Sequence, residues 1–313
     1  MGNAASDHGT PRKILLATDL SARGDRALER ALSLCVGWNA ELVIVHALED
    51  THDPPDMSRR PALPSWHGLP DAVSVARRRI AQGLRADLGE RVGKSAVFVA
   101  EGEPAEVIER IAAGEACDLI ITGTAREQPF VLRPYTLGKT VDRLLRRSTI
   151  PILVVRNRAR SAYEHIVAAT DFSDSSAVAL QVALRFFPLQ RLALLHAYEA
   201  PYQTLLTDPA RYQDAHHQDQ YRGSLERELE TFLAKLSLPH EDRRRIDPLI
   251  EFGRPESLFR DYVFHHDADL VVFGTYGHHA VFEALIGSTA KGIASMLPCD
   301  ALIVPRAIVQ NPA

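Results

Sequence analysis

Short apolar runs alternate along the chain with segments of helical periodicity. In the first half, the runs read ILLAT, LVIVHAL, AVFVA, LIITG and ILVV, and none shows strict alternation of apolar and polar residues. Runs of this kind are typical of strands that are covered on both faces of a sheet. The segments between them, such as Asp25–Gly37 and Pro104–Gly114, have apolar residues at helical spacing, and the second begins with Pro and ends with Gly. This order predicts an α/β fold with a doubly wound parallel sheet.

The whole pattern occurs twice. KILLATDLS from Lys13 returns as HIVAATDFS from His165, and the stretch from Glu101 to LIITGT returns as the stretch from Glu251 to LVVFGT. Equivalent positions lie about 150 residues apart, which is the size of a domain and too long for a solenoid unit. We therefore expect a disordered N-terminus at 1–11 and two tandem domains at 12–158 and 162–308, called the first and second copy below. Each copy is predicted to be a doubly wound, five-stranded parallel-sheet domain.

The last apolar run of each copy is predicted to be a sheet edge. These runs are IPILVV from Ile150 and DALIVP from Asp300. An exposed apolar edge is a liability that natural proteins cover, so the two edges can cover each other about a pseudo-twofold axis. Long polar insertions at 49–70 and 200–220 follow the second strand of each copy, and the second insertion leads into a charged helix at Ser224–Leu236.

Composition narrows the class of protein. The net charge of −4 gives no reason to expect nucleic-acid binding, and no apolar run is long enough to span a membrane. The three cysteines lie far apart without a CxxC pair, which fits a reducing cytoplasm. The N-terminus spells M-G-x-x-x-S, the myristoylation pattern at Gly2, but we interpret it as a polar, disordered start. We expect a soluble, cytoplasmic protein without nucleic-acid or membrane partners.

Candidate chemistry gathers in the second copy. Gly274 and Gly277 follow the apolar run ADLVVF, and Gly287 precedes the hydroxyls of Ser288 and Thr289 at the start of a helix. Open α/β sheets bind ligands at the carboxyl ends of their strands. Glycines at such an end allow φ > 0 and a close approach of the backbone, and a helix start favours anions. Singly these are ordinary turn and cap residues, but their combination predicts a phosphate cradle.

An acidic residue completes this pattern. Asp171 directly follows the first strand of the second copy, where a carboxylate suits the hydroxyls of a ribose.

The spacing G-x2-G-x9-G-[ST] resembles the ATP-binding signature of the universal stress protein family, and the resemblance covers nearly the whole chain as a tandem-domain member. It implies an adenine nucleotide alpha hydrolase-like fold and ATP as ligand, with Mg²⁺ as a further candidate. It places adenine near Ala197, ribose near Asp171 and Gly274, and phosphates at Gly277 and the helix start. The complete predicted site comprises Ala169, Thr170, Asp171, Ala197, Phe273, Gly274, Gly277, His278, Gly287, Ser288, Thr289 and Ala290.

The first copy departs from this signature. Gly123 and Gly138 remain, but Arg126 stands at the position of Gly277 and Lys139 at that of Ser288. The spacer is also longer and contains Pro129 and Pro134, so we expect the cradle of the first copy to be filled or stiffened. LGKT at 137–140 does not belong to a Walker A loop, because Arg133 stands where that loop needs Gly.

The resemblance predicts an ATP-binding stress-response or regulatory protein that signals by ligand-dependent conformation or association. It would form a homodimer and act on an unidentified regulatory protein. No catalytic residue or metal ligand is predicted, and turnover would at most be weak ATPase activity. An alternative is a scaffold that binds no nucleotide.

Two further classes fit the sequence less well. The adjacent histidine pairs at 216–217, 265–266 and 278–279 suggest a metal-binding module, but they lack the spacing of ligands. An adenylating ligase would need a Gly-rich loop after the first strand, where TDFSDSS stands instead.

Overall fold

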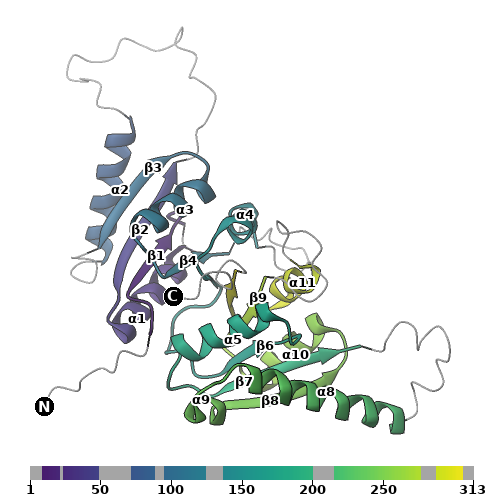
Figure 1. Cartoon of the computed structure of the whole chain (residues 1–313). Helices are drawn as coiled ribbons and strands as arrows, with labels where there is room; N and C mark the ends of the chain where they lie inside the picture. The colour runs from purple at the N-terminus through teal and green to yellow at the C-terminus, as the bar shows by residue number, and fades with distance from the viewer. Residues whose placement is uncertain are drawn as a thin grey trace, which may run out of the picture.

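The computed structural model describes residues 9–21, 24–48, 72–88, 95–124, 137–199, 215–275 and 287–305 (Figure 1). The strands are β1 (Lys13–Ala17), β2 (Glu41–Leu48), β3 (Ala96–Glu101), β4 (Leu119–Gly123), β5 (Ile152–Val155), β6 (Ile166–Ala169), β7 (Leu192–Tyr198), β8 (Ile246–Phe252), β9 (Leu270–Gly274) and β10 (Asp300–Val304). The helices are α1 (Gly24–Trp38), α2 (Ala72–Leu88), α3 (Pro104–Gly114), α4 (Lys139–Arg147), α5 (Asp174–Phe186), α8 (Ala215–Lys235), α9 (His240–Arg244), α10 (Pro255–His266) and α11 (Ser288–Met296).

All ten strands form one sheet in the order β3-β2-β1-β4-β5-β10-β9-β6-β7-β8. Strands within each half run parallel, and the halves meet at β5 and β10, which pair antiparallel with Leu302 opposite Leu153. The prediction that the last strands of the two copies cover each other is thus confirmed. Each copy contributes five strands, as predicted, but the two sheets are continuous.

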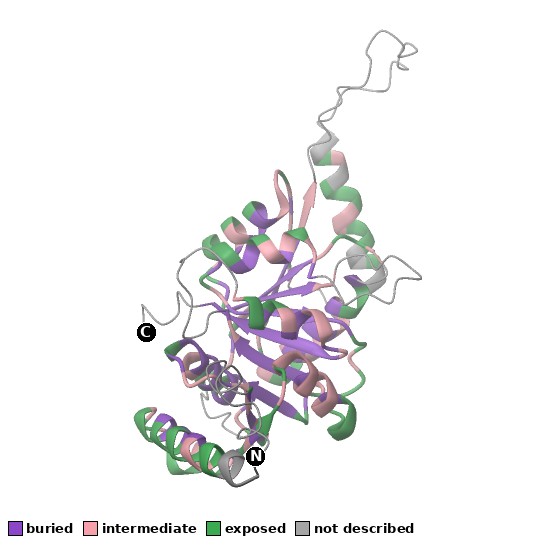
Figure 2. Ribbon diagram, turned by 90° about the vertical axis from the view of Figure 1, so that its right-hand side faces the viewer, coloured by how far each residue is buried: buried purple, intermediate pink, exposed green. Residues whose placement is uncertain are grey.

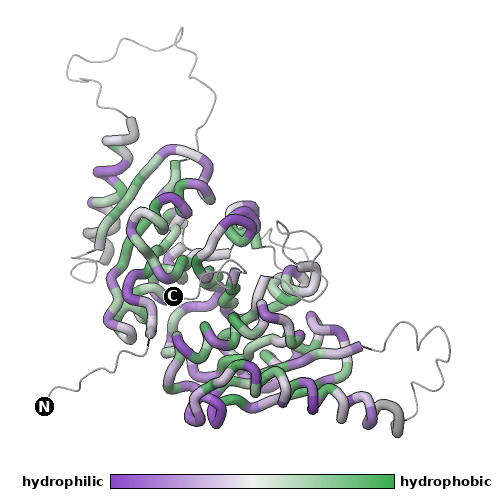
Figure 3. The backbone as a smooth tube through the Cα atoms, viewed as in Figure 1, coloured by the Kyte–Doolittle hydropathy of each residue, from purple (hydrophilic) through white to green (hydrophobic). Residues whose placement is uncertain are grey.

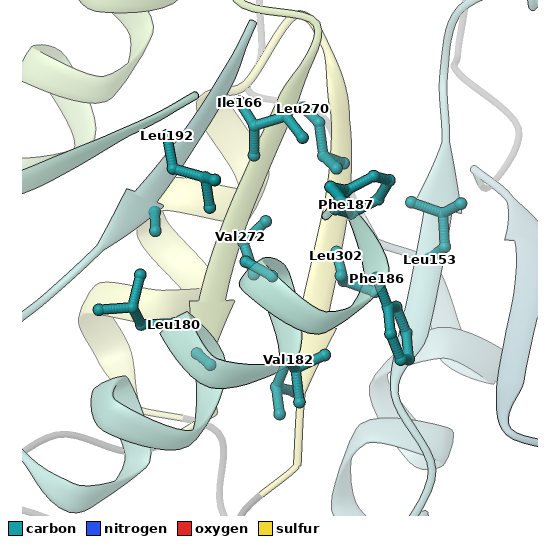
Figure 4. Close-up of a cluster of buried hydrophobic side chains, with 14 of the residues drawn as sticks. Leu153, Ile166, Leu180, Val182, Phe186, Phe187, Leu192, Leu270, Val272 and Leu302 are labelled. Atoms are coloured by element: carbon teal, nitrogen blue, oxygen red, sulfur yellow. The ribbon is translucent and has the colours of Figure 1, made fainter. Parts of the chain in front are cut away.

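Helices cover both faces of the sheet (Figures 1 and 2). One buried cluster joins the sheet to α1, α5 and α8, and the other joins it to α3, α4, α10 and α11. The strands in the middle are apolar along most of their length, as the green parts of Figure 3 show. Near the joint, Phe186 of α5 lies in the same buried cluster as Leu302 of the second copy and Leu153 of the first, so the core continues from one copy into the other (Figure 4).

The helices begin and end close to the predicted residues. α3 has the predicted bounds, and its first turn is capped by Glu103, whose carboxylate accepts a hydrogen bond from Glu106 N at 3.1 Å. The charged helix predicted at Ser224–Leu236 is the second part of α8. Residues 1–8 and both insertions, apart from the start of α8, lie outside the described residues.

Candidate functional site

A tight turn follows the first strand of each copy. In the second copy, Asp171 Oδ1 accepts hydrogen bonds from Ser173 N at 3.1 Å and from Ser173 Oγ at 2.5 Å. In the first copy, Asp19 Oδ1 accepts the same two bonds from Ser21 at 3.0 and 2.6 Å. These bonds hold each carboxylate at the carboxyl end of its strand, where the sequence predicted Asp171 to act.

A histidine on the neighbouring strand supports this turn. His196 Nδ1 lies 2.9 Å from the carbonyl oxygen of Thr170, and His46 Nδ1 lies 2.9 Å from that of Thr18. Because a carbonyl oxygen only accepts, each Nδ1 carries the proton when the ring is neutral. Burial lowers the pKa of His196, so its neutral form is favoured. Sequence reasoning missed this pair, although a histidine at the same place in both copies was the available signal.

The predicted helix start is present at α11. Gly287 is the N-cap, and its N–H donates to the carbonyl oxygen of Thr275 at 2.8 Å, which holds the helix end beside β9. The first intrahelical bond runs from Lys291 N to Gly287 O at 3.0 Å. The amides of Ser288 to Ala290 therefore precede the helical ladder, and the side chains of Ser288 and Thr289 are exposed. This is the geometry with which a helix start binds an anion.

The predicted backbone conformation of Gly274 is wrong. The sequence suggested that Gly274 adopts φ > 0, yet its φ lies outside the positive range. A β-carbon on Gly274 would instead lie 2.9 Å from the carbonyl oxygen of Ser175 in the first turn of α5. Glycine is needed here because β9 and α5 are in close contact.

The remaining predicted residues lie at the same end of the second copy. Phe273 and Ala290 belong to the buried cluster that includes α10 and α11, and the partly buried Ala169 packs against it. Ala197 is the penultimate residue of β7. Gly277 and His278 lie outside the described residues.

The first copy contains a cavity of about 350 Å³ at the equivalent place. Gly138, the N-cap of α4, has a φ of 82°, a conformation that glycine adopts without strain. The expectation of a filled or stiffened cradle rests on three other residues and stays a prediction. Arg126, Pro129 and Pro134 lie outside the described residues.

The lining of this cavity reproduces the predicted site of the second copy. Ten of the twelve predicted residues lie in the described part of the chain, and the equivalents of all ten line the cavity of the first copy. These equivalents are Ala17, Thr18, Asp19, Ala47, Thr122, Gly123, Gly138, Lys139, Thr140 and Val141. The residues predicted in one copy thus have equivalents that lie around one pocket in the other copy.

The two sites differ in charge at the helix start. Lys139 is exposed at the first position of α4, where the second copy has the hydroxyl of Ser288. An ammonium at this position adds a full positive charge to the partial charge of a helix N-terminus.

Metal-binding clusters and membrane-spanning helices are absent from the described residues. In that part of the chain, no three or more His, Cys, Asp or Glu side chains gather so that they could hold a metal ion. Nor does any described helix combine the length and the apolar character needed to cross a membrane.

Comparisons with known proteins agree with this architecture. A solved universal stress protein of Archaeoglobus fulgidus DSM 4304 superimposes with a TM-score of 0.61 at 16% identity, over 94% of this chain and 98% of that one. A universal stress protein structure from Pseudomonas aeruginosa UCBPP-PA14 gives a TM-score of 0.60 at 21% identity, over 97% of this chain and 96% of that one. At these identities the likeness shows the fold alone, which is the adenine nucleotide alpha hydrolase-like fold.

Sequence comparison adds the family. A curated universal stress protein of Staphylococcus aureus (strain USA300) is 37% identical over 60 residues, which are 19% of this chain and 36% of that protein. The match thus spans about a third of the length of this curated relative. The model of the universal stress protein family matches residues 10–156 and again residues 162–305. The chain therefore belongs to the universal stress protein family, with two family domains in tandem.

Proposed function

We propose that this chain is an ATP-binding regulatory protein of the stress response that holds an adenine nucleotide in its second copy. The observation that carries the proposal is the cavity of the first copy, whose lining repeats the predicted second-copy site residue by residue. The second copy adds the intact G-x2-G-x9-G-S spacing and an α11 start that lies against the carboxyl end of β9.

Each part of the site would bind one part of the nucleotide. The base would lie against the end of β7 near Ala197, and the carboxylate of Asp171 would accept hydrogen bonds from ribose hydroxyls. The phosphates would meet the amides and hydroxyls at Ser288 and Thr289, together with Gly277 and His278. Mg²⁺ would enter with the phosphates and neutralise part of their charge.

The proposed output is a change of conformation or association. A phosphate cradle positions a ligand but does not by itself supply a base for hydrolysis, so any ATPase activity would be weak. In this proposal the two copies, at 12–158 and 162–308, are separate domains. The protein acts in the cytoplasm. A whole-chain homodimer and a regulatory protein would transmit the bound state.

A second candidate is a ligand site in the first copy as well. Its cavity lies at the lower end of the range for small-molecule sites, roughly 300–1,000 Å³. Lys139 at the start of α4 favours an anionic ligand there.

The test begins with small molecules released from freshly purified, denatured protein and counted per chain by mass spectrometry. One adenine nucleotide per chain supports a single working site, and two support a site in each copy. If none is released and calorimetry detects no binding of ATP with Mg²⁺, the proposal is wrong and the scaffold alternative stands.

A matched pair of variants then assigns the site. Ser288→Asp places a negative charge where the phosphates would lie, yet an acid in the first turn favours the helix itself. Its affinity for ATP should fall by about tenfold or more, or about 1.4 kcal/mol, with no loss of thermal stability. Lys139→Asp places the same carboxylate at the equivalent position of the first copy and should leave the affinity unchanged if only the second copy binds. If Lys139→Asp lowers the affinity for ATP and Ser288→Asp does not, the nucleotide binds in the first copy.

A further inference from the structure

A buried carboxylate ties the two copies together at the start of β10. Asp300 is 1% exposed, and its Oδ1 accepts hydrogen bonds from the backbone N–H groups of Arg156 at 2.8 Å and Asn157 at 3.1 Å. Its Oδ2 accepts the hydroxyl of Tyr163 at 2.6 Å and lies 3.5 Å from Nε of Arg30. One side chain of the second copy thus binds the connecting segment and a helix of the first copy.

Arg30 of α1 supplies the matching positive charge. It is 5% exposed, its Nη1 donates to the carbonyl oxygen of Ser161 at 2.8 Å, and its guanidinium lies 4.0 Å from the ring centroid of Tyr163. A buried charge that loses its partner is strongly destabilising, because it has left water without compensation. Arg30 and Asp300 therefore depend on each other.

The internal repeat shows that neither charge has an equivalent in the other copy. Counting from Asp19 and Asp171, the position of Arg30 corresponds to Val182 of α5. In the sheet, Ala301 pairs with Val271 as Ile152 pairs with Ile120, so the position of Asp300 corresponds to Pro151. The first copy thus has Arg and Pro at the two positions where the second copy has Val and Asp.

A second pair of equivalent positions, closer to the surface, also differs in charge between the copies. Asp142 is the fourth residue of α4 and Lys291 the fourth of α11, and Lys291 Nζ lies 3.5 Å from Asp142 Oδ1. If two like copies met in the same way, Asp142 would face a second Asp142, or Lys291 a second Lys291. Such a pair of like charges is unfavourable, although solvent screening keeps the effect small.

We propose that Arg30 and Asp300, together with Asp142 and Lys291, form a pairing code. By this code the β5 edge of a first copy pairs with the β10 edge of a second copy, and neither edge pairs with its own kind. Two first copies would leave Arg30 buried opposite a proline. Two second copies would leave Asp300 buried opposite a valine. The partner that this surface fits is therefore the complementary copy of the same sequence, and a homodimer of whole chains has to use another face.

The test uses the full chain with a protease site inserted after Ala159, in a part of the connecting segment where Arg158 and Arg160 are exposed. After folding, the chain is cut, dissociated in urea, refolded by dilution and examined by native mass spectrometry. The wild-type halves should form only unlike pairs. The variant Arg30→Val with Asp300→Pro, in which both copies carry the uncharged residues, should also form like pairs. A statistical mixture in the wild-type protein, or unlike pairs alone in the variant, would overturn the proposal.

The uncut chain gives a second test that does not depend on refolding of the halves. Arg30→Val leaves Asp300 without its ion pair and should lower the urea midpoint of unfolding. Adding Asp300→Asn removes the stranded charge, so the double variant should unfold at a higher urea concentration than Arg30→Val alone. Glu29→Val is the matched control, since its ion pair with Arg158 is exposed. If the two substitutions at 30 and 300 lower the midpoint additively, the charges are not coupled and the code is wrong.

Discussion

Gly274 lies directly against Ser175, so that a β-carbon at position 274 would lie 2.9 Å from the carbonyl oxygen and 3.0 Å from the carbonyl carbon of Ser175. Both atoms belong to the backbone of α5 and cannot rotate away. Gly274→Ala should therefore shift the first turn of α5 and lower the free energy of unfolding by about 1–3 kcal/mol. Urea unfolding without any ligand measures this effect.

Gly223 provides the matched control for that substitution. It lies inside α8, and no heavy atom lies within 4 Å of the place where its β-carbon would be. Gly223→Ala should raise the free energy of unfolding by about 0.5–1 kcal/mol, because alanine is the better helix former. Equal losses in the two variants would contradict the packing role of Gly274.

The turn after the first strand contains a non-glycine residue with positive φ in each copy, Leu20 at 58° and Phe172 at 64°. Leu20 is 43% exposed, whereas Phe172 stacks on His196 with a centroid distance of 4.2 Å. Asparagine tolerates this conformation better than either residue. Leu20→Asn should stabilise the protein by up to about 1 kcal/mol, and Phe172→Asn should destabilise it by about 2–3 kcal/mol through lost packing. Thermal unfolding measures the stability of both variants. Stability changes of the same sign in the two variants would refute this account.

His196 predicts a pH dependence of stability. Burial lowers the pKa of its imidazole below the ordinary value of 6.5, so the unfolded chain binds the proton more readily than the folded one. The stability that this group contributes is complete above that value and is lost as the pH falls towards the folded-state pKa. His196→Gln should therefore lose less stability than the wild type between about pH 8 and about pH 5.5.

Urea unfolding at these two pH values measures the difference in slope. His240→Gln, at an exposed position in α9, is the control for removing an imidazole elsewhere in the chain. A His196→Gln slope equal to that of the wild type would refute the assignment.

Arg245 caps the C-terminal end of α5, although it lies some sixty residues later in the sequence. Its guanidinium donates to the carbonyl oxygens of Phe187 at 2.8 Å, Gln190 at 2.8 Å and Leu184 at 3.2 Å. A lysine cannot reach three carbonyls in this fixed geometry, so Arg245→Lys should cost about 1–3 kcal/mol. Arg243→Lys alters a more exposed pair with Glu230 and should cost about 0–1 kcal/mol. Chemical denaturation of the two variants tests the contrast, which fails if Arg243→Lys is the more costly change.

The fold was predictable because its determinants are local and are repeated. Strands buried on both faces read as unbroken apolar runs, and a helix such as α3 carries its own start and stop in Pro104 and Gly114. Duplication then identified the two last strands as the edges, and the structure pairs them. The continuity of all ten strands follows from that pairing.

The site was predictable only in part, because packing between distant segments is not visible in a motif. The first-copy equivalents of the predicted residues line one cavity, and the start of α11 lies where the sequence predicted it. The role of Gly274 depends on its contact with Ser175, about a hundred residues away, which no spacing rule reveals. The same holds for Arg30 and Asp300, whose relationship appears only when the copies are joined.

The antiparallel joint of β5 and β10 also has a consequence for biosynthesis. β5 ends at Val155 and β10 begins at Asp300, so a ribosome adds roughly 145 residues between the two. At about 5–20 residues per second, the nascent chain carries an uncovered apolar strand for about 7–30 seconds. The strand is only four residues long, and the arginines at 146, 147, 156 and 158 surround it with charge. Both features discourage neighbouring nascent chains on a polysome from aggregating through this edge before the second copy arrives.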